Sequence, residues 1–135
     1  MNSFKKDFKL LARTSPFTDM IGPIYQKKGK TGLVVGLLVE DKHCNARGTV
    51  HGGIYGTLAD IAMGYSVAFS TNPPTPVVTV SQTIDYVGKA QVGDWLEVHT
   101  DIQKVGRRLS FANCYFVVNE QRIARSSGVF SVTDG

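Results

Sequence analysis

The order of apolar and polar residues divides the chain into one long helical segment and a series of extended segments. Between residues 51 and 70, apolar side chains recur at helical spacing, and the Asn-Pro-Pro run at 72–74 ends this pattern. Apolar and polar residues then alternate over 78–86 and again over 95–102, which is typical of half-buried strands. Two further β-rich runs follow at residues 107–118 and 122–132.

The N-terminal part of the chain carries shorter signals. Residues 3–12 favour a short amphipathic helix that ends near residues 14–16. Residues 23–29 and 31–40 are two extended runs around a glycine-containing turn, which indicates a hairpin. A single long helix among so many strands must be covered by their sheet. The pattern therefore predicts an α+β fold, in which an antiparallel sheet of five to six strands wraps around one central helix.

The long helix is predicted to have two different faces. Asp60 lies about 130° away from the apolar stripe in helical geometry, on a face with Gly53, Gly56 and Gly64. Each glycine costs about 1 kcal/mol relative to alanine in a helix, so we expect another backbone or a ligand to approach this face closely. The alternative is that Asp60 is an ordinary exposed residue. The stripe predicted to face the core consists of Ile54, Leu58, Ile61, Tyr65, Ala68 and Phe69.

Composition indicates a single globular domain that spans residues 1–135. The chain is 42% hydrophobic and 19% charged, and its apolar runs are too short to cross a membrane. The first residues lack the apolar core of a signal peptide. Cys44 and Cys114 have no metal-ligand spacing, so we expect reduced thiols, no metal site and a cytoplasmic location.

The net charge of +4 suits an anionic small molecule that carries phosphates. The 15 basic residues are spread along the sequence without a basic arm or a helical stripe, so we expect no nucleic-acid partner. One local cluster surrounds a predicted turn, where Lys104, Arg107 and Arg108 could contact phosphates. Arg47 and Lys89 are weaker candidates for the same contact.

The start of the long helix has chemistry of its own. The first N–H groups of a helix lack internal partners, and Gly52 and Gly53 have no side chains to cover them, so they could bind an oxyanion or a thioester carbonyl. Asp60 lies eight residues further on, or about 12 Å along the helix axis. Its carboxylate cannot reach a carbonyl held at the start of its own helix. If both groups act on one carbonyl, they must come from two copies of the chain.

These residues resemble a known family. The motif His43-x-Asn45-x-x-Gly48-x-x-His51-Gly52-Gly53, followed by Asp60, resembles the hotdog-fold acyl-CoA thioesterases, in particular the phenylacetate-pathway type. The resemblance covers roughly residues 17–132. It implies a homodimer formed through sheet edges, and beyond it a homotetramer. It also implies hydrolysis of an acyl-CoA substrate with no cofactor, since coenzyme A is part of the substrate.

The resemblance also implies roles for individual residues. The N–H of Gly52 would polarise the thioester carbonyl, with Asn45 helping to position the carbonyl or a water molecule. Asp60 of the partner chain would activate water or attack the carbonyl directly, assisted by the hydroxyl of Thr79 or, as the alternative, of Ser81.

The remaining residues are assigned to substrate binding or to the frame of the site. His51 and Gly53 are expected beside the substrate, with His51 orienting the start of the helix. Cys44 is interpreted as a packing residue and His99 as a structural or surface histidine. A non-catalytic acyl-CoA-binding protein on the same fold is the alternative function. A dehydratase would need another arrangement of histidine and carboxylate, and the sequence contains no such motif.

Overall fold

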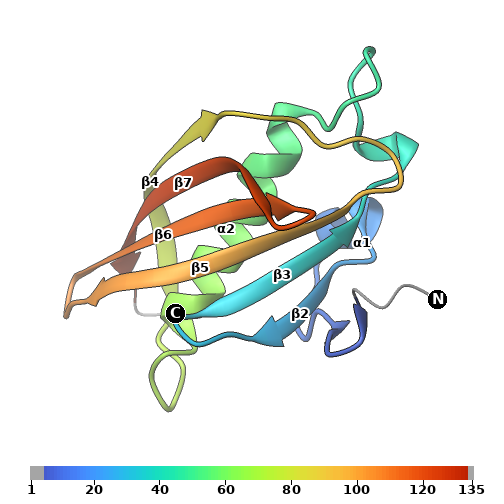
Figure 1. Cartoon of the computed structure of the whole chain (residues 1–135). Helices are drawn as coiled ribbons and strands as arrows, with labels where there is room; N and C mark the ends of the chain where they lie inside the picture. The colour runs from blue at the N-terminus through green and yellow to red at the C-terminus, as the bar shows by residue number, and fades with distance from the viewer. Residues whose placement is uncertain (1–4, 134–135) are drawn as a thin grey trace.

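The computed structural model describes residues 5–133, and over this range a curved antiparallel sheet wraps around one long helix (Figure 1). The sheet has seven strands in the order β1-β2-β3-β5-β6-β7-β4. This is the predicted α+β architecture, and the strand beyond the expected five to six is the two-residue β1. The strands are β1 (Lys9–Leu10), β2 (Tyr25–Lys28), β3 (Leu33–Leu38), β4 (Val77–Tyr86), β5 (Trp95–Val105), β6 (Leu109–Val118) and β7 (Gln121–Val132). The helical elements are α1 (Pro16–Ile21), the 3-10 turn η2 (Asp41–His43) and α2 (Gly52–Ala68).

The predicted helix over residues 3–12 is wrong where the structure describes it, and residues 3 and 4 lie outside the described part. Lys9 and Leu10 form β1, which pairs with β2. The short helix α1 lies further along the chain and begins where the sequence suggested a stop. Ser15 is its N-cap and accepts a hydrogen bond from the Thr18 N–H, while Pro16 takes the first helical position. The same Ser-Pro pair thus starts α1.

The long helix α2 is confirmed, but its core-facing side differs from the predicted stripe. Tyr65 is only partly buried, and Phe69 lies just beyond the helix with half of its surface exposed. Because the sheet curves around α2, the helix is apolar around most of its circumference, and its sequence periodicity has no sharp direction. The residues that α2 buries are Tyr55, Leu58, Ala59, Ile61, Ala62, Met63, Gly64, Ser66 and Val67.

The edge strand β4 lies along the remaining face of α2. A β-bulge between Thr79 and Ser81 shifts its register against β7. Thr79 pairs with the buried Phe130 and Gln82 pairs with Gly128, so both side chains face the helix. Ser81 pairs with Val129 on the other side of the sheet.

Three hydrogen bonds fasten β4 to α2 at intervals of one helical turn. The Thr79 hydroxyl donates to Asp60, and Gln82 Nε2 donates to the Gly56 carbonyl at 3.0 Å. The Tyr86 hydroxyl donates to the Gly52 carbonyl at 2.9 Å. Residues 52, 56 and 60 lie one above another on the helix, so the face that contains Asp60 is the face along which β4 runs.

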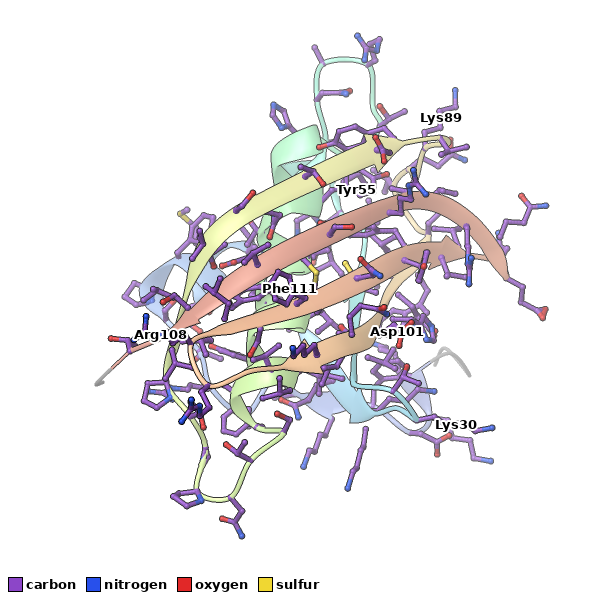
Figure 2. All side chains as sticks on the ribbon, turned by 90° about the vertical axis from the view of Figure 1, so that its left-hand side faces the viewer. Lys30, Tyr55, Lys89, Asp101, Arg108 and Phe111 are labelled. Carbon is purple, nitrogen blue, oxygen red and sulfur yellow. The ribbon has the colours of Figure 1, made fainter. Side chains whose placement is uncertain are left out.

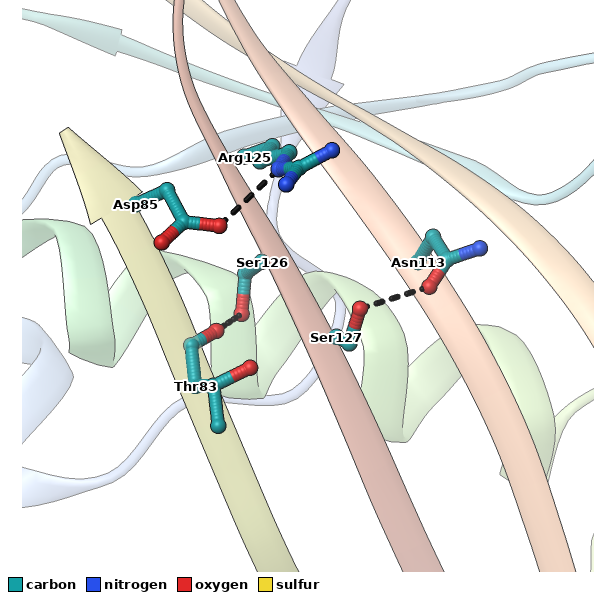
Figure 3. A network of polar contacts seen from close by, with 6 residues as sticks. All are labelled: Thr83, Asp85, Asn113, Arg125, Ser126 and Ser127. Carbon is teal, nitrogen blue, oxygen red and sulfur yellow. Dashed lines mark hydrogen bonds and ion pairs between the residues drawn. The ribbon is translucent and has the colours of Figure 1, made fainter. Parts of the chain in front are cut away.

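The outer side of the sheet is polar where β4, β7 and β6 lie side by side (Figure 3). Arg125 forms an ion pair with Asp85 at 2.9 Å, and the Ser127 hydroxyl donates to Asn113 Oδ1 at 2.8 Å. Both partners of the ion pair are well exposed, so it contributes little to stability. In the described part of the chain, no helix is both long enough and apolar enough to span a bilayer.

Candidate active site

The segment before α2 is held in place by a fully buried histidine. His43 Nδ1 accepts a hydrogen bond from the Glu40 N–H at 2.9 Å, so the proton of the neutral ring lies on Nε2. That nitrogen donates to the carbonyl of Ile21 at the end of α1, at 2.6 Å. The His43 carbonyl in turn accepts from the His51 N–H. His43 is therefore a structural residue of the motif.

The side chain of Asn45 organises the loop that follows. Its Oδ1 accepts hydrogen bonds from the backbone N–H groups of Arg47 and Thr49, at 2.9 and 3.2 Å. Its Nδ2 donates to the Thr49 hydroxyl at 3.0 Å. An amide has two N–H bonds, so one Nδ2 hydrogen remains for a ligand. Asn45 thus shapes its loop and still offers one donor.

The two glycines at the start of α2 are not equivalent. His51 is the N-cap, and its Nδ1 accepts from the Gly53 N–H at 2.9 Å. The sequence predicts that Gly53 contacts substrate, but this N–H is already occupied. The Gly52 N–H makes no backbone or side-chain hydrogen bond within residues 5–133. Of the two predicted donors, Gly52 is therefore the one left to bind an oxyanion.

A groove of about 530 Å³ opens beside Gly52 and Asn45. Tyr55 and Tyr86 form its aromatic wall, with ring centroids 5.3 Å apart. Burial raises the pKa of the Tyr55 phenol, which therefore stays protonated. The groove also contains Arg47 and Lys89, the weaker phosphate contacts in the sequence prediction.

The side chain of Asp60 is exposed. Its Oδ1 accepts a short hydrogen bond, 2.5 Å, from the Thr79 hydroxyl. Two grooves meet at this pair. One, of about 540 Å³, runs past Gly53, Gly56 and Phe17, and the other, of about 740 Å³, runs along the C-terminal half of α2. The carboxylate is therefore positioned by Thr79 and open to a ligand.

The two predicted halves of the site lie apart within one chain. The groove with Asn45 and Gly52 shares no lining residue with either groove that contains Asp60. Along β4, Thr79 lies beside Asp60, whereas Tyr86 contacts Gly52 seven residues further on. A single chain therefore presents each half without the other.

Three other predicted binding residues line none of these three grooves. Lys104 is at the end of β5, and Arg107 and Arg108 form the turn to β6, where the Arg108 carbonyl accepts from the Val132 N–H. Figure 2 shows Arg108 and Lys89 at opposite ends of the sheet. The basic turn therefore lies at the far end of the sheet from the groove that contains Asn45 and Gly52.

Ser81 is exposed on the outer side of β4 and does not meet Asp60. Sequence reasoning missed Gln82 and Tyr86, which hold the helix face of the site. The sequence feature that could have identified them is the spacing of four residues between Gly52, Gly56 and Asp60. Polar residues recur at a similar spacing on the strand that packs against this face.

The two cysteines and His99 make contacts within the frame of the protein and line none of the three grooves described above. Cys44 donates weakly to the Glu40 carbonyl, and burial raises the pKa of the Cys114 thiol to about 12. His99 hydrogen-bonds to Glu97 at 2.8 Å, and this bond lowers the pKa of the Glu97 carboxyl. Within residues 5–133, no three His, Cys, Asp or Glu side chains gather as a metal site.

Comparisons with a family model and with known proteins all point to thioesterases and esterases. A sequence model of the thioesterase superfamily matches residues 47–125. The chain is 46% identical over 131 residues to "Putative esterase PA0474" of Pseudomonas aeruginosa, which covers 96% of this chain and 98% of that protein. It is 29% identical over 112 residues to human acyl-coenzyme A thioesterase 13, covering 82% of this chain and 79% of the human protein.

A solved structure shows the same similarity. The zebrafish thioesterase superfamily member 2 superposes with a TM-score of 0.80 at 27% identity, covering 88% of each chain.

Proposed function

Because this chain belongs to the thioesterase superfamily, we propose that it hydrolyses an acyl-CoA thioester at a site shared between two subunits. The products are a carboxylic acid and free coenzyme A. The observation that carries the proposal is the Asp60–Thr79 pair, an exposed carboxylate held in a groove by a hydroxyl. A further structure supports the substrate class. The Streptococcus mutans protein smu.793, crystallised with acetyl-CoA, is 25% identical with a TM-score of 0.78, covering 91% of this chain and 95% of that one.

The chemistry needs one base and one oxyanion donor. Asp60 accepts a proton from water as the water oxygen attacks the thioester carbon, or its carboxylate attacks that carbon directly. The Gly52 N–H, at the positive end of α2, stabilises the negative charge that develops on the carbonyl oxygen. Collapse of the tetrahedral intermediate breaks the carbon–sulfur bond, and the sulfur takes up the proton that Asp60 accepted, so that coenzyme A leaves as its thiol. After direct attack, water hydrolyses the acyl–Asp60 anhydride to release the acid and supplies this proton. These steps call for no metal or redox cofactor.

The proposal that two subunits share each site rests on the separation of Gly52 and Asp60 within one chain. Gly52 and Asp60 are about 12 Å apart along one helix, whereas a base must come within about 3 Å of the group it acts on. The separate grooves around the two residues agree with this argument.

The edge strand β4 suggests how two copies would meet. β4 is ten residues long, pairs only with β7 among the described strands, and leaves Val78 and Val80 exposed. Such an edge is a template for pairing with another chain. A two-fold axis near Gln82 would pair β4 with its own copy in antiparallel fashion, about 4.8 Å away. The Thr79 end of one strand would then lie against the Tyr86 end of the other.

This pairing would bring Asp60 of one protomer towards Asn45 and Gly52 of its partner, twice per dimer. Arg47 and Lys89 beside Gly52 are the cations best placed to meet the phosphates of coenzyme A. Lys104, Arg107 and Arg108 would contact these phosphates only if the substrate extends across the β4–β4 interface towards the end of the sheet where Asp60 lies. A homotetramer and a cytoplasmic location remain predictions.

The proposal is tested by replacing Asp60 with asparagine. The amide oxygen of the new side chain can still accept the Thr79 hydrogen bond and, because the site is exposed, we expect D60N to fold normally. The amide cannot take a proton, so kcat should fall by about 10²- to 10⁴-fold. The measurement is release of free thiol from a panel of aromatic, medium-chain and branched acyl-CoAs.

A folded D60N protein with near-normal turnover would remove Asp60 from the reaction. Binding of acyl-CoA to the unaltered protein without thiol release would instead favour the non-catalytic binding protein. If thiol is released, oxygen-18 incorporation under single-turnover conditions separates direct attack by Asp60 from attack by water.

A further inference from the structure

A separate groove of about 570 Å³ lies between the C-terminal part of α2 and the β2–β3 hairpin. It shares only Tyr65 and Phe69 with the groove that leads to Asp60. Neither Asp60, Thr79, Asn45 nor Gly52 lines it. The groove is therefore distinct from the proposed reaction site, although the two are neighbours.

The floor of this groove is apolar. Tyr65 and Phe69 pack edge to face with centroids 5.9 Å apart, and Leu33 and Ile102 complete the surface. Phe69 leaves 52% of its surface exposed. An aromatic residue this open beside a concave surface is a favourable contact for an apolar ligand.

The rim of the groove is positively charged. Lys9, Lys28 and Lys30 line it, and no carboxylate of residues 5–133 does. Neither of the two ion pairs among the described residues involves these lysines. Lys9 pairs across the strands with Gln26, whose other neighbour Val35 is buried in the core, so Lys9 is on the helix-facing side of the sheet.

The charge of the sequence is concentrated in this region. Residues 5–30 contain seven basic and two acidic residues, a net charge of +5, while the whole chain carries +4. The rest of the chain is therefore slightly negative. Basic residues that look dispersed along the sequence gather at this edge of the sheet, and Figure 2 shows Lys30 there, far from Lys89.

The backbone beneath the rim is fixed. The Leu33 N–H donates to Ser66 Oγ on α2 at 2.8 Å, and the Thr31 hydroxyl donates to the Thr100 carbonyl at 2.8 Å. Gly32 between them has a φ of +152°, and a side chain there would press against Thr100. The hairpin that carries Lys28 and Lys30 is thus anchored to both the helix and the sheet.

We propose that this groove binds a fatty carboxylate, with its alkyl chain on Tyr65 and Phe69 and its carboxylate among the three lysines. The volume suits a small molecule, and the surface combines one apolar floor with one cationic rim. Coenzyme A alone has no alkyl chain to cover the floor. This binding site does not depend on the proposed hydrolysis, since none of the residues assigned to that reaction lines the groove.

Isothermal titration of the whole protein with decanoate tests the proposal. We expect saturable binding that weakens as salt screens the lysines. Butyrate, which has the same head group, and decyltrimethylammonium, which has the same tail, should bind at least about tenfold more weakly. Coenzyme A should not compete for the site.

Two variants locate the site. K28Q/K30Q removes two charges and F69S removes one of the two aromatic rings of the floor, and each should weaken decanoate binding by about tenfold. R122Q removes an exposed cation at the start of β7, outside this groove, and should bind decanoate like the unaltered protein. Circular dichroism melting checks that every variant is folded. Absence of saturable binding, or equal affinity in K28Q/K30Q and R122Q, would overturn the proposal.

Discussion

Thr79 owes its position to one irregularity in β4. In a regular strand, residues 79 and 82 face opposite sides. The bulge between Thr79 and Ser81 adds one residue, so that Thr79 shares the helix-facing side with Gln82. The strict alternation of the sequence gives no sign of this bulge. The family resemblance could therefore favour Thr79 over Ser81, but the sequence could not show that both Thr79 and Gln82 face α2.

Removal of the Thr79 hydroxyl should reduce turnover. In T79V the carboxylate of Asp60 loses its hydrogen bond, and a bond to a charged group contributes about 1.5–3 kcal/mol. We expect kcat to fall by about ten- to a hundredfold. T79S retains the hydroxyl and should keep most of the activity. Steady-state kinetics of the two variants gives the comparison, and equal rates in T79V and T79S would show that the hydroxyl plays no part.

Asn45 needs a test that separates its two tasks. N45A removes both the acceptor that shapes the loop and the remaining donor, and should cost about 10²-fold in kcat. N45D keeps an acceptor for the N–H groups of Arg47 and Thr49 but has no N–H to offer. If Asn45 donates to the substrate, N45D should be as slow as N45A.

A purely structural role of Asn45 predicts a different pattern of rates in the two variants. If its role is confined to the loop, N45D should retain nearly full activity while N45A loses it. A change below twofold in N45A would remove Asn45 from the site altogether. Thermal melting of both variants distinguishes loss of chemistry from loss of structure.

At the scale of elements, the relation between α2 and β4 explains the unusual composition of the helix. Gly52, Gly56 and Asp60 repeat every four residues, and each receives a hydrogen bond from β4. The sequence correctly indicates that something approaches this face closely. It could not identify β4 as the neighbour, since strand order depends on contacts between residues far apart in the chain.

Sequence predicts the elements more reliably than their orientation. The bounds of α2 follow from the Asn-Pro-Pro stop, and alternation locates β4 and β5 to within a few residues. The stripe on α2 is misplaced because a helix enclosed by a curved sheet is apolar on nearly every side. The misplaced N-terminal helix has a local cause, because a Ser-Pro pair can end one segment and cap the next.

Ser66 links α2 to β3, and its removal should cost stability. Its hydroxyl donates to the Ala62 carbonyl and accepts the Leu33 N–H. S66A leaves that N–H unpaired in a part-buried place, so the free energy of unfolding should fall by about 1–3 kcal/mol. Urea denaturation measures the change. S127A, on the exposed outer side of the sheet, is the matched control and should change stability by less than about 0.5 kcal/mol. Equal stability of S66A and S127A would contradict this role.

At the scale of the whole molecule, each chain carries two half-sites for the proposed reaction, at opposite ends of β4. One carries the carboxylate of Asp60, and the other carries the free N–H of Gly52. An exposed edge strand runs from one end to the other, with Thr79 and Tyr86 near its two ends. Self-pairing of such a strand is the simplest way to bring unlike ends together, because a two-fold axis reverses its direction.

Complementation between two inactive variants tests this arrangement. In a D60N dimer both sites lack the base, and in an N45A dimer both lack the amide. A mixed dimer places both defects in one site and restores the other, which takes Asn45 from the D60N chain and Asp60 from the N45A chain. After subunit exchange in an equal mixture, about one quarter of the sites should regain full turnover. If each chain held a complete site of its own, mixing would restore nothing, because every chain would still carry one defect.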